Sequence, residues 1–121
     1  MNTLFLITLI VEGIFGLGFL FIPAKMLEPY GVILNETATT FARLFGSAVL
    51  TFPILLWFAR KSDHKKFRKT VVYGLFFYYF VSTIPLLMAQ LNRQMNNLGW
   101  LIVCLHCILL VWFGYFASKR N

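Results

Sequence analysis

Near its start the chain has an unbroken apolar stretch, LFLITLIVEGIFGLGFLFI, at residues 4–22. Its only charged residue is Glu12. At a rise of about 1.5 Å per residue, a helix of this length crosses a hydrocarbon core of about 30 Å. A membrane core offers no water to the backbone N–H and C=O groups, so such a stretch folds as a helix. The stretch therefore predicts a transmembrane helix.

Three further stretches of the same kind follow, at residues 41–59, 71–89 and 98–117. The whole chain of 121 residues is 60% hydrophobic and only 12% charged, whereas an ordinary soluble domain is about 25% charged. This composition excludes a soluble enzyme, a disordered tail and a nucleic-acid-binding module with a basic face. It predicts an integral membrane protein, and we expect no nucleic-acid partner.

The fold class predicted is all-α, an integral membrane bundle of four transmembrane helices in a single domain over residues 1–121. The helices are expected at about 4–22, 38–59, 70–90 and 98–117. Pro53 and Pro85 are expected to interrupt the second and third helices, because each proline removes a backbone hydrogen bond. The segment 24–35 is predicted to lie at the membrane interface, with Asn35 or Thr37 capping the second helix.

Basic residues are distributed unequally between the two ends of the predicted bundle. The second loop and the C-terminal tail carry eight Lys and Arg residues, and the opposite side carries three. Since Lys and Arg accumulate in cytoplasmic loops, we expect a multi-pass protein of the cell membrane, in bacteria the inner membrane, with both termini in the cytoplasm. The basic loop is interpreted mainly as this topology signal, with binding of anionic lipid as the alternative.

Polar residues inside the apolar stretches are the candidate functional residues. Counted at about 1.5 Å per residue, Glu12, Tyr79, Thr51 and His106 all fall within a few ångströms of the membrane midplane. Ser82 and Thr83 follow Tyr79 at nearly the same depth. The sequence therefore predicts a polar layer to which all four helices contribute.

Glu12 is the strongest of these candidates. An ionised carboxylate at the bilayer centre is unfavourable by about 2.5–3.5 kcal/mol, so such residues face the bundle interior or a cavity. Glu12 is therefore expected to be protonated or paired, and His106 is the partner closest in depth. Arg43 is too far along the bundle axis for direct contact and is expected to reach the outer interface or to meet Gln90 and Asn92. The alternative is that Glu12 and His106 only hold the bundle together.

The candidate ligand-binding residues are five of those polar side chains together with Arg43. They are Glu12, Arg43, Tyr79, Ser82, Thr83 and His106.

Small residues predict where the first two helices approach each other. Gly13 and Gly16 lie on the side of the first helix that carries Glu12, and Gly46 and Ser47 share a face of the second. Small residues let membrane helices pack closely. We therefore expect these two faces to meet.

Both cysteines of the chain lie in the fourth apolar stretch, as Cys104-Leu105-His106-Cys107. Cysteines three residues apart share a helix face, and this CxxC spacing can lower one thiol pKa and permit a disulfide. In helix count and in this spacing the chain resembles thiol–quinone oxidoreductases of the vitamin K epoxide reductase type. Those enzymes also use a second, loop cysteine pair, which this chain does not have. The alternative is that both are small buried apolar residues, and the spacing does not fit a zinc site.

The segment Ala42-Arg43-Leu44-Phe45-Gly46, after a glycine-rich first helix and before a basic loop and two more helices, is similar to small four-helix bacterial membrane proteins of the DoxX-like type. This resemblance implies the four-helix fold and no site residue. Some DoxX-type proteins are linked to quinone-coupled sulfur oxidation.

Two functions are compatible with these features. The first is a non-catalytic membrane protein, without cofactor, whose mid-membrane polar pocket holds a small lipophilic ligand or a proton, or an accessory subunit of a larger membrane complex. The second is a redox enzyme in which Cys104 and Cys107 react with a quinone. The expected partners are the lipid bilayer, a small lipophilic molecule and a second copy or a larger complex.

The predicted orientation can be tested with a cysteine placed at Ser62, in the basic loop. A membrane-impermeant thiol reagent should reach this position from the cytoplasmic side only. Labelling from the outside alone would contradict the orientation.

Overall fold

The computed structural model describes residues 1–120, which contain helices and no strand. In chain order the elements are α1 (Asn2–Phe21), α2 (Pro23–Leu27), the 3-10 helix η1 (Glu28–Tyr30), α3 (Glu36–Val49), α4 (Thr51–Lys61), α5 (Lys65–Leu91) and α6 (Gly99–Ser118). Four spans are long and apolar enough to cross a membrane: α1, α3 with α4, α5 and α6. The all-α prediction with four apolar spans is confirmed.

The second span is two helices rather than the single helix expected at 38–59. A turn at Leu50 separates α3 from α4. Pro53 lies in the first turn of α4 and has no N–H to donate to the carbonyl of Val49, four residues earlier. The first turn of a helix needs no such donor, so the chain begins a new helix there.

The third span shows the opposite outcome, because α5 continues through Pro85 without a break. The expected interruption is therefore wrong at this position. Neighbouring helices commonly hold a membrane helix together around a proline, and α6 packs along α5. The interfacial segment before α3 ends as predicted, since the Asn35 side chain accepts a hydrogen bond from the Ala38 N–H at 2.8 Å.

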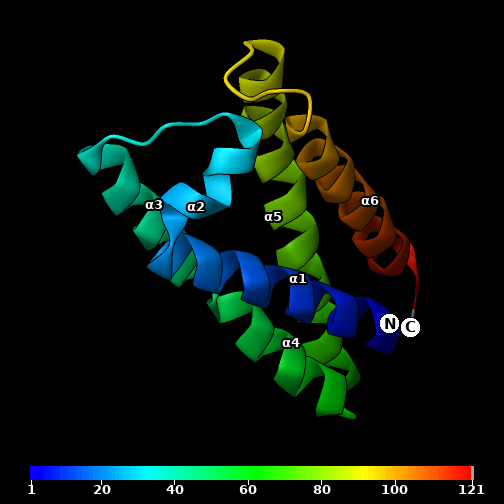
Figure 1. Cartoon of the computed structure of the whole chain (residues 1–121). Coiled ribbons are helices and arrows are strands. Elements are labelled where there is room, and N and C mark those ends of the chain that lie inside the picture. The colour runs from blue at the N-terminus through cyan, green and yellow to red at the C-terminus, as the bar shows by residue number, and fades with distance from the viewer. Residues whose placement is uncertain (121) are drawn as a thin grey trace.

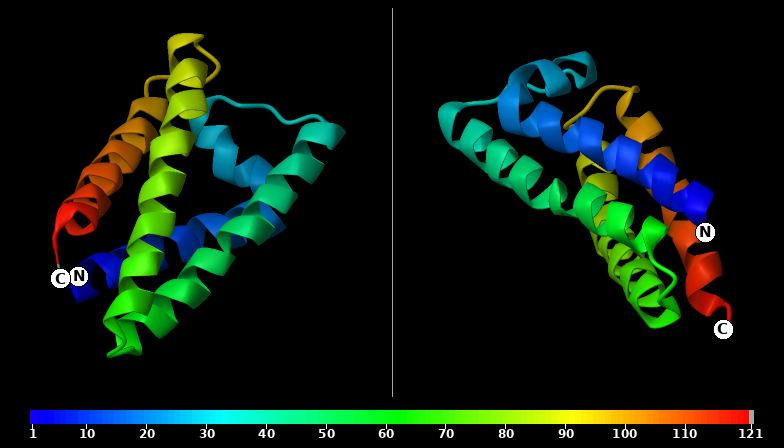
Figure 2. Two further views of the ribbon diagram at one scale, coloured as in Figure 1. Left: turned by 180° about the vertical axis from the view of Figure 1, so that it is seen from behind. Right: turned by 90° about the horizontal axis from the view of Figure 1, so that it is seen from below.

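The helices form two packed groups that meet at one end of the molecule. Helix α1 packs on α3 and α4, and α5 packs on α6. Figure 1 shows α1 crossing in front of α5, while α3 diverges from α5 toward the opposite end. Figure 2 shows the same separation from behind. The buried core, which includes Leu4, Phe5, Leu56, Val72 and Phe113, lies where the two groups meet.

Glycines bring α1 and α3 into close contact. A Cβ atom on Gly46 would lie 2.6 Å from the backbone N of Leu20 and 2.7 Å from the carbonyl oxygen of Gly16. A Cβ atom on Gly16 would lie 2.8 Å from the Leu50 side chain. The expected contact is therefore made by Gly16 and Gly46, whereas Ser47 is exposed and bonds back to the Arg43 carbonyl.

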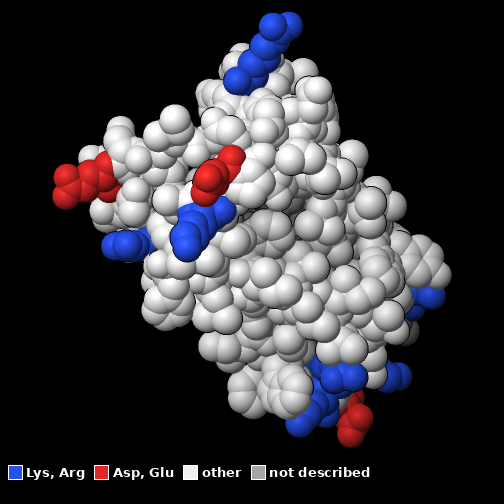
Figure 3. All heavy atoms as spheres, viewed as in Figure 1, with Lys and Arg blue, Asp and Glu red and all other residues white. Residues whose placement is uncertain are grey.

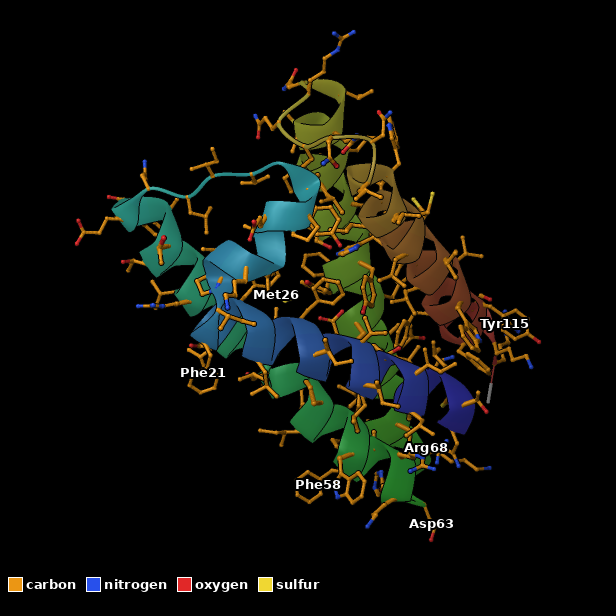
Figure 4. The ribbon with its side chains drawn as sticks, viewed as in Figure 1. Phe21, Met26, Phe58, Asp63, Arg68 and Tyr115 are labelled. Carbon is orange, nitrogen blue, oxygen red and sulfur yellow. The ribbon has the colours of Figure 1, made fainter. Side chains whose placement is uncertain are left out.

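The outer surface of the bundle is apolar, as in a protein surrounded by lipid. Figure 4 shows Phe21, Phe58 and Tyr115 pointing away from the helices that carry them. Each of the three is more than half exposed. A soluble monomer rarely exposes so much contiguous apolar surface. Together with the four apolar spans, this surface indicates a membrane protein.

Basic side chains gather at the end where α4 meets α5 (Figure 3). Two of them form hydrogen bonds with residues near the chain termini. Arg68 donates to the side chain of Asn2 and to the carbonyl of Ser62, and Lys69 donates to the carbonyls of Phe116 and Lys119. Both termini therefore lie at the basic end, as the even number of predicted crossings requires.

At the opposite end, a hydrogen-bonded link joins η1 to the loop between α5 and α6. The backbone N–H of Asn96 donates to the Tyr30 carbonyl at 2.9 Å, and its side chain donates to the Pro29 carbonyl at 2.8 Å. Gly31 follows η1 and has a φ of 73°, a left-handed conformation that glycine adopts more readily than other residues. This link ties the segment after α1 to the loop between α5 and α6.

The close approach of α1 and α3 gives a stability prediction. Gly46→Ala should lower stability by about 1–3 kcal/mol, because the added methyl group overlaps the backbone of α1. Gly74→Ala is the matched control, since a Cβ there meets no atom within 4 Å, and it should be neutral or stabilising by up to about 1 kcal/mol. Reversible unfolding in mixed micelles measures both. Equal stability of the two variants would contradict the packing.

Candidate functional site

A cavity of about 440 Å³ lies between the two helix groups. Its walls come from α1, α3, α5 and α6 and from the segments that close the end opposite the termini. Most of the lining is apolar; the described residues that line it are Val11, Glu12, Phe15, Phe19, Leu27, Val32, Phe45, Tyr78, Tyr79, Ser82, Pro85, Leu86, Ala89, Gln94, Met95, Ile102, Leu105, His106 and Leu109.

Glu12 lies in this cavity wall and faces the bundle interior. It is 4% exposed, on the α1 face that also buries Thr8 and Gly16. Its Oε1 accepts a hydrogen bond from the hydroxyl of Tyr79 on α5. This bond joins the two helix groups at the cavity, where a polar group without a partner would be unfavourable.

Tyr79 is fixed by aromatic contacts on several sides. Its ring stacks on Phe113 at a centroid distance of 5.7 Å and meets His106 edge-on at 5.4 Å. Tyr78 packs against it edge-on at 5.0 Å. Aromatic pairs at these distances stabilise a defined ring position. The hydroxyl is therefore held where it meets Glu12.

His106 lines the same cavity, but it is not the hydrogen-bond partner of Glu12. Its Nδ1 lies 3.1 Å from the carbonyl oxygen of Ile102, one turn earlier on α6. The expected Glu12–His106 pair is thus replaced by an indirect arrangement, in which the Tyr79 ring contacts His106 and the Tyr79 hydroxyl contacts Glu12. Depth along the bundle identified His106 as a neighbour of the cavity, but depth alone carries no information on side-chain direction.

Of Ser82 and Thr83, only Ser82 lines the cavity. Ser82 lines the cavity, and its buried Oγ has no hydrogen-bond partner among the described residues. Thr83 is not part of the lining, and its hydroxyl donates to the Tyr79 carbonyl at 2.6 Å. Thr83 therefore satisfies its own helix backbone, as hydroxyl side chains in helices often do.

The second span brings no polar side chain to the cavity. Arg43 and Thr51 are both exposed and absent from the lining, so the predicted contribution of these residues is wrong. Arg43 does not reach Gln90, whose side chain instead donates to the Asn96 carbonyl. The only lining residue from α3 is Phe45. The polar groups of the cavity come from α1, α5, α6 and the loop residue Gln94.

Cys104 and Cys107 are free and exposed on α6. They lie outside the cavity lining, whereas the intervening Leu105 and His106 belong to it. Cys107 instead borders a shallow groove with Ile108 and Val111 on the outer surface. The alternative that both cysteines are small buried apolar residues is therefore wrong. Within residues 1–120 no group of three or more His, Cys, Asp or Glu side chains could hold a metal ion.

Three features of the site were not identified from the sequence. Thr8 is fully buried one turn before Glu12, and its hydroxyl has no partner among the described residues. Its spacing from Glu12 was a usable signal, because residues four apart share a helix face. Tyr78 and Gln94 also line the cavity. Tyr78 gave no signal, since it sits among several aromatic residues of the same stretch.

Comparison of the chain with protein-family models, with curated proteins and with solved structures found no match.

The Glu12–Tyr79 hydrogen bond gives a second stability prediction. Glu12→Gln should remain within about 1 kcal/mol of the native stability, because the amide oxygen still accepts from Tyr79. Glu12→Leu should destabilise by about 1–3 kcal/mol, because it leaves the buried Tyr79 hydroxyl without a partner.

A double-mutant cycle of Glu12→Leu with Tyr79→Phe isolates this interaction. Unfolding in mixed micelles should give a coupling energy of about 0.6 kcal/mol and at most about 1.7 kcal/mol, the average and the maximum measured for hydrogen bonds between membrane helices. Tyr78→Phe is the matched control and should show no coupling to Glu12→Leu. Additive effects of Glu12→Leu and Tyr79→Phe would contradict the hydrogen bond.

Proposed function

We propose that the protein binds a small lipophilic molecule in the cavity between the two helix groups. The observation that carries this proposal is the combination of an unfilled volume of about 440 Å³ with converging polar groups in an apolar wall. Sites for small molecules are typically cavities of about 300–1,000 Å³ with mainly apolar walls and a few polar groups.

The polar groups are placed to orient a bound molecule. Glu12 contributes one carboxyl oxygen to Tyr79, and none of the described hydrogen bonds uses the other oxygen. Ser82 adds a hydroxyl without a partner on the facing helix. A ligand with one polar head group would place it between Glu12 and Ser82. Its apolar part would then contact Phe15, Phe19 and other apolar side chains of the lining.

We place this binding site in a multi-pass protein of the cell membrane, with both termini and the basic end in the cytoplasm. The support is the location of the basic side chains at the end that also holds both termini. The resemblance to DoxX-like proteins and an association with a second copy or a larger complex remain expectations. The cavity needs neither for its walls, because one chain supplies them.

A thiol–quinone oxidoreductase is the alternative function. Cys104 and Cys107 face outward from α6, so a quinone bound in the cavity would not contact them. The alternative therefore requires a separate site on the outer face of α6. A Cys104→Ser, Cys107→Ser double variant that keeps the native phenotype would contradict the oxidoreductase alternative.

Binding in the cavity can be tested with 1-aminonaphthalene, a neutral lipophilic amine whose fluorescence reports the polarity around it. Protein in phosphatidylcholine nanodiscs should bind it saturably above the signal of protein-free nanodiscs. Ala89→Phe should weaken binding by about tenfold or more, because the new ring occupies the cavity.

Ala48→Phe is the matched control for this experiment. Ala48 is exposed on α3 and outside the lining, so the same substitution there should leave binding unchanged. Ser82→Leu provides a second cavity variant and should also weaken binding. Equal fluorescence changes in native protein and in both cavity variants would show partition into lipid and would contradict the proposal.

A further inference from the structure

The charges around the cavity are of one sign. Glu12 is its only carboxyl group, and the described residues that line it include no lysine or arginine. Arg43 is exposed on α3 and lies outside the lining. His106 directs one ring nitrogen to the Ile102 carbonyl. An ionised Glu12 would therefore have a hydrogen bond from Tyr79 but no counter-charge from the cavity wall.

Aromatic rings surround the same space. Phe15, Phe19 and Phe45 line one side, and Phe19 meets Phe45 edge-on at a centroid distance of 5.5 Å. Tyr78 lines the other side beside Glu12, whereas the ring of Tyr79 is fully buried against Phe113, His106 and Tyr78. Aromatic faces attract organic cations, and this attraction strengthens where water is excluded. The cavity thus combines the two features that recognise a lipophilic cation: one carboxylate and several aromatic rings.

We propose that the ligands of this site are lipophilic organic cations, such as quaternary ammonium or protonated amine compounds, with Glu12 as their counter-charge. This inference rests on the proposed function, because it specifies the ligand class of the same cavity. A cationic head group would lie beside Glu12, and its apolar substituents would contact the phenylalanine rings of α1 and α3. An anionic head group would meet Glu12 without a lysine or arginine of the described lining to offset the repulsion.

The charge preference can be measured with two ligands of nearly the same shape. Benzyltrimethylammonium carries a positive charge, and neopentylbenzene replaces its nitrogen by carbon. Each is titrated against bound 1-aminonaphthalene in phosphatidylcholine nanodiscs, which have no net lipid charge. The native protein should bind the cation at least about tenfold more tightly than its neutral isostere.

Glu12→Gln should abolish this preference, because the amide keeps the shape of the side chain and removes only its charge. Glu36→Gln is the matched control, since it removes an exposed carboxyl group outside the cavity and should leave the preference unchanged. If Glu12→Gln does not fold, Tyr78→Leu supplies the test. It should weaken binding of the cation more than binding of neopentylbenzene.

The outcomes separate the two proposals. Tighter or equal binding of neopentylbenzene, with saturable binding of 1-aminonaphthalene, overturns the cation inference and leaves the proposed function standing. A cation preference that persists in Glu12→Gln also overturns the inference. Absence of saturable 1-aminonaphthalene binding overturns both.

Discussion

A carboxyl group inside an apolar bundle needs a hydrogen-bond partner, and Tyr79 supplies it to Glu12. The bond joins α1 to α5, and therefore one helix group to the other, beside the cavity. On one side of this point the apolar core is filled, from Leu4 and Phe5 to Phe113. On the other side lies the cavity. The position of Glu12 therefore sets the boundary between packed core and open space.

The cavity follows from how the second span packs. Gly16 and Gly46 bring α3 against α1, so α3 runs along α1 and away from α5. The break at Leu50 then lets α4 return toward α5, with Leu56 buried in the common core. The link from Asn96 to Pro29 and Tyr30 spans the separated ends. The glycine contacts thus hold α3 on α1 and away from α5, while α4 and α5 meet at the other end.

Apolar length alone predicted the four spans, because a run of that length has no other stable fold in a membrane. The burial of Glu12 was also predictable, from the free energy of a charge in lipid. The partner was not, because depth along the axis does not say how far each helix is rotated. For the same reason Arg43 and Thr83 were expected at the site and lie outside it. An interruption was expected at Pro53, and the helix breaks nearby at Leu50. Helix α5 continues through Pro85, because its packing against neighbouring helices could not be predicted from the sequence.

The most direct test of the account is the distance between Glu12 and Tyr79 in a lipid bilayer. Solid-state NMR can measure it with ¹³C at the carboxyl carbon of Glu12 and at the phenol carbon that bears the Tyr79 hydroxyl. The account predicts a dipolar coupling strong enough for direct hydrogen-bond contact, which Tyr79→Phe should alter by shifting the Glu12 carboxyl resonance. No coupling between the two labels, with a Glu12 carboxyl signal that Tyr79→Phe leaves unchanged, would contradict it.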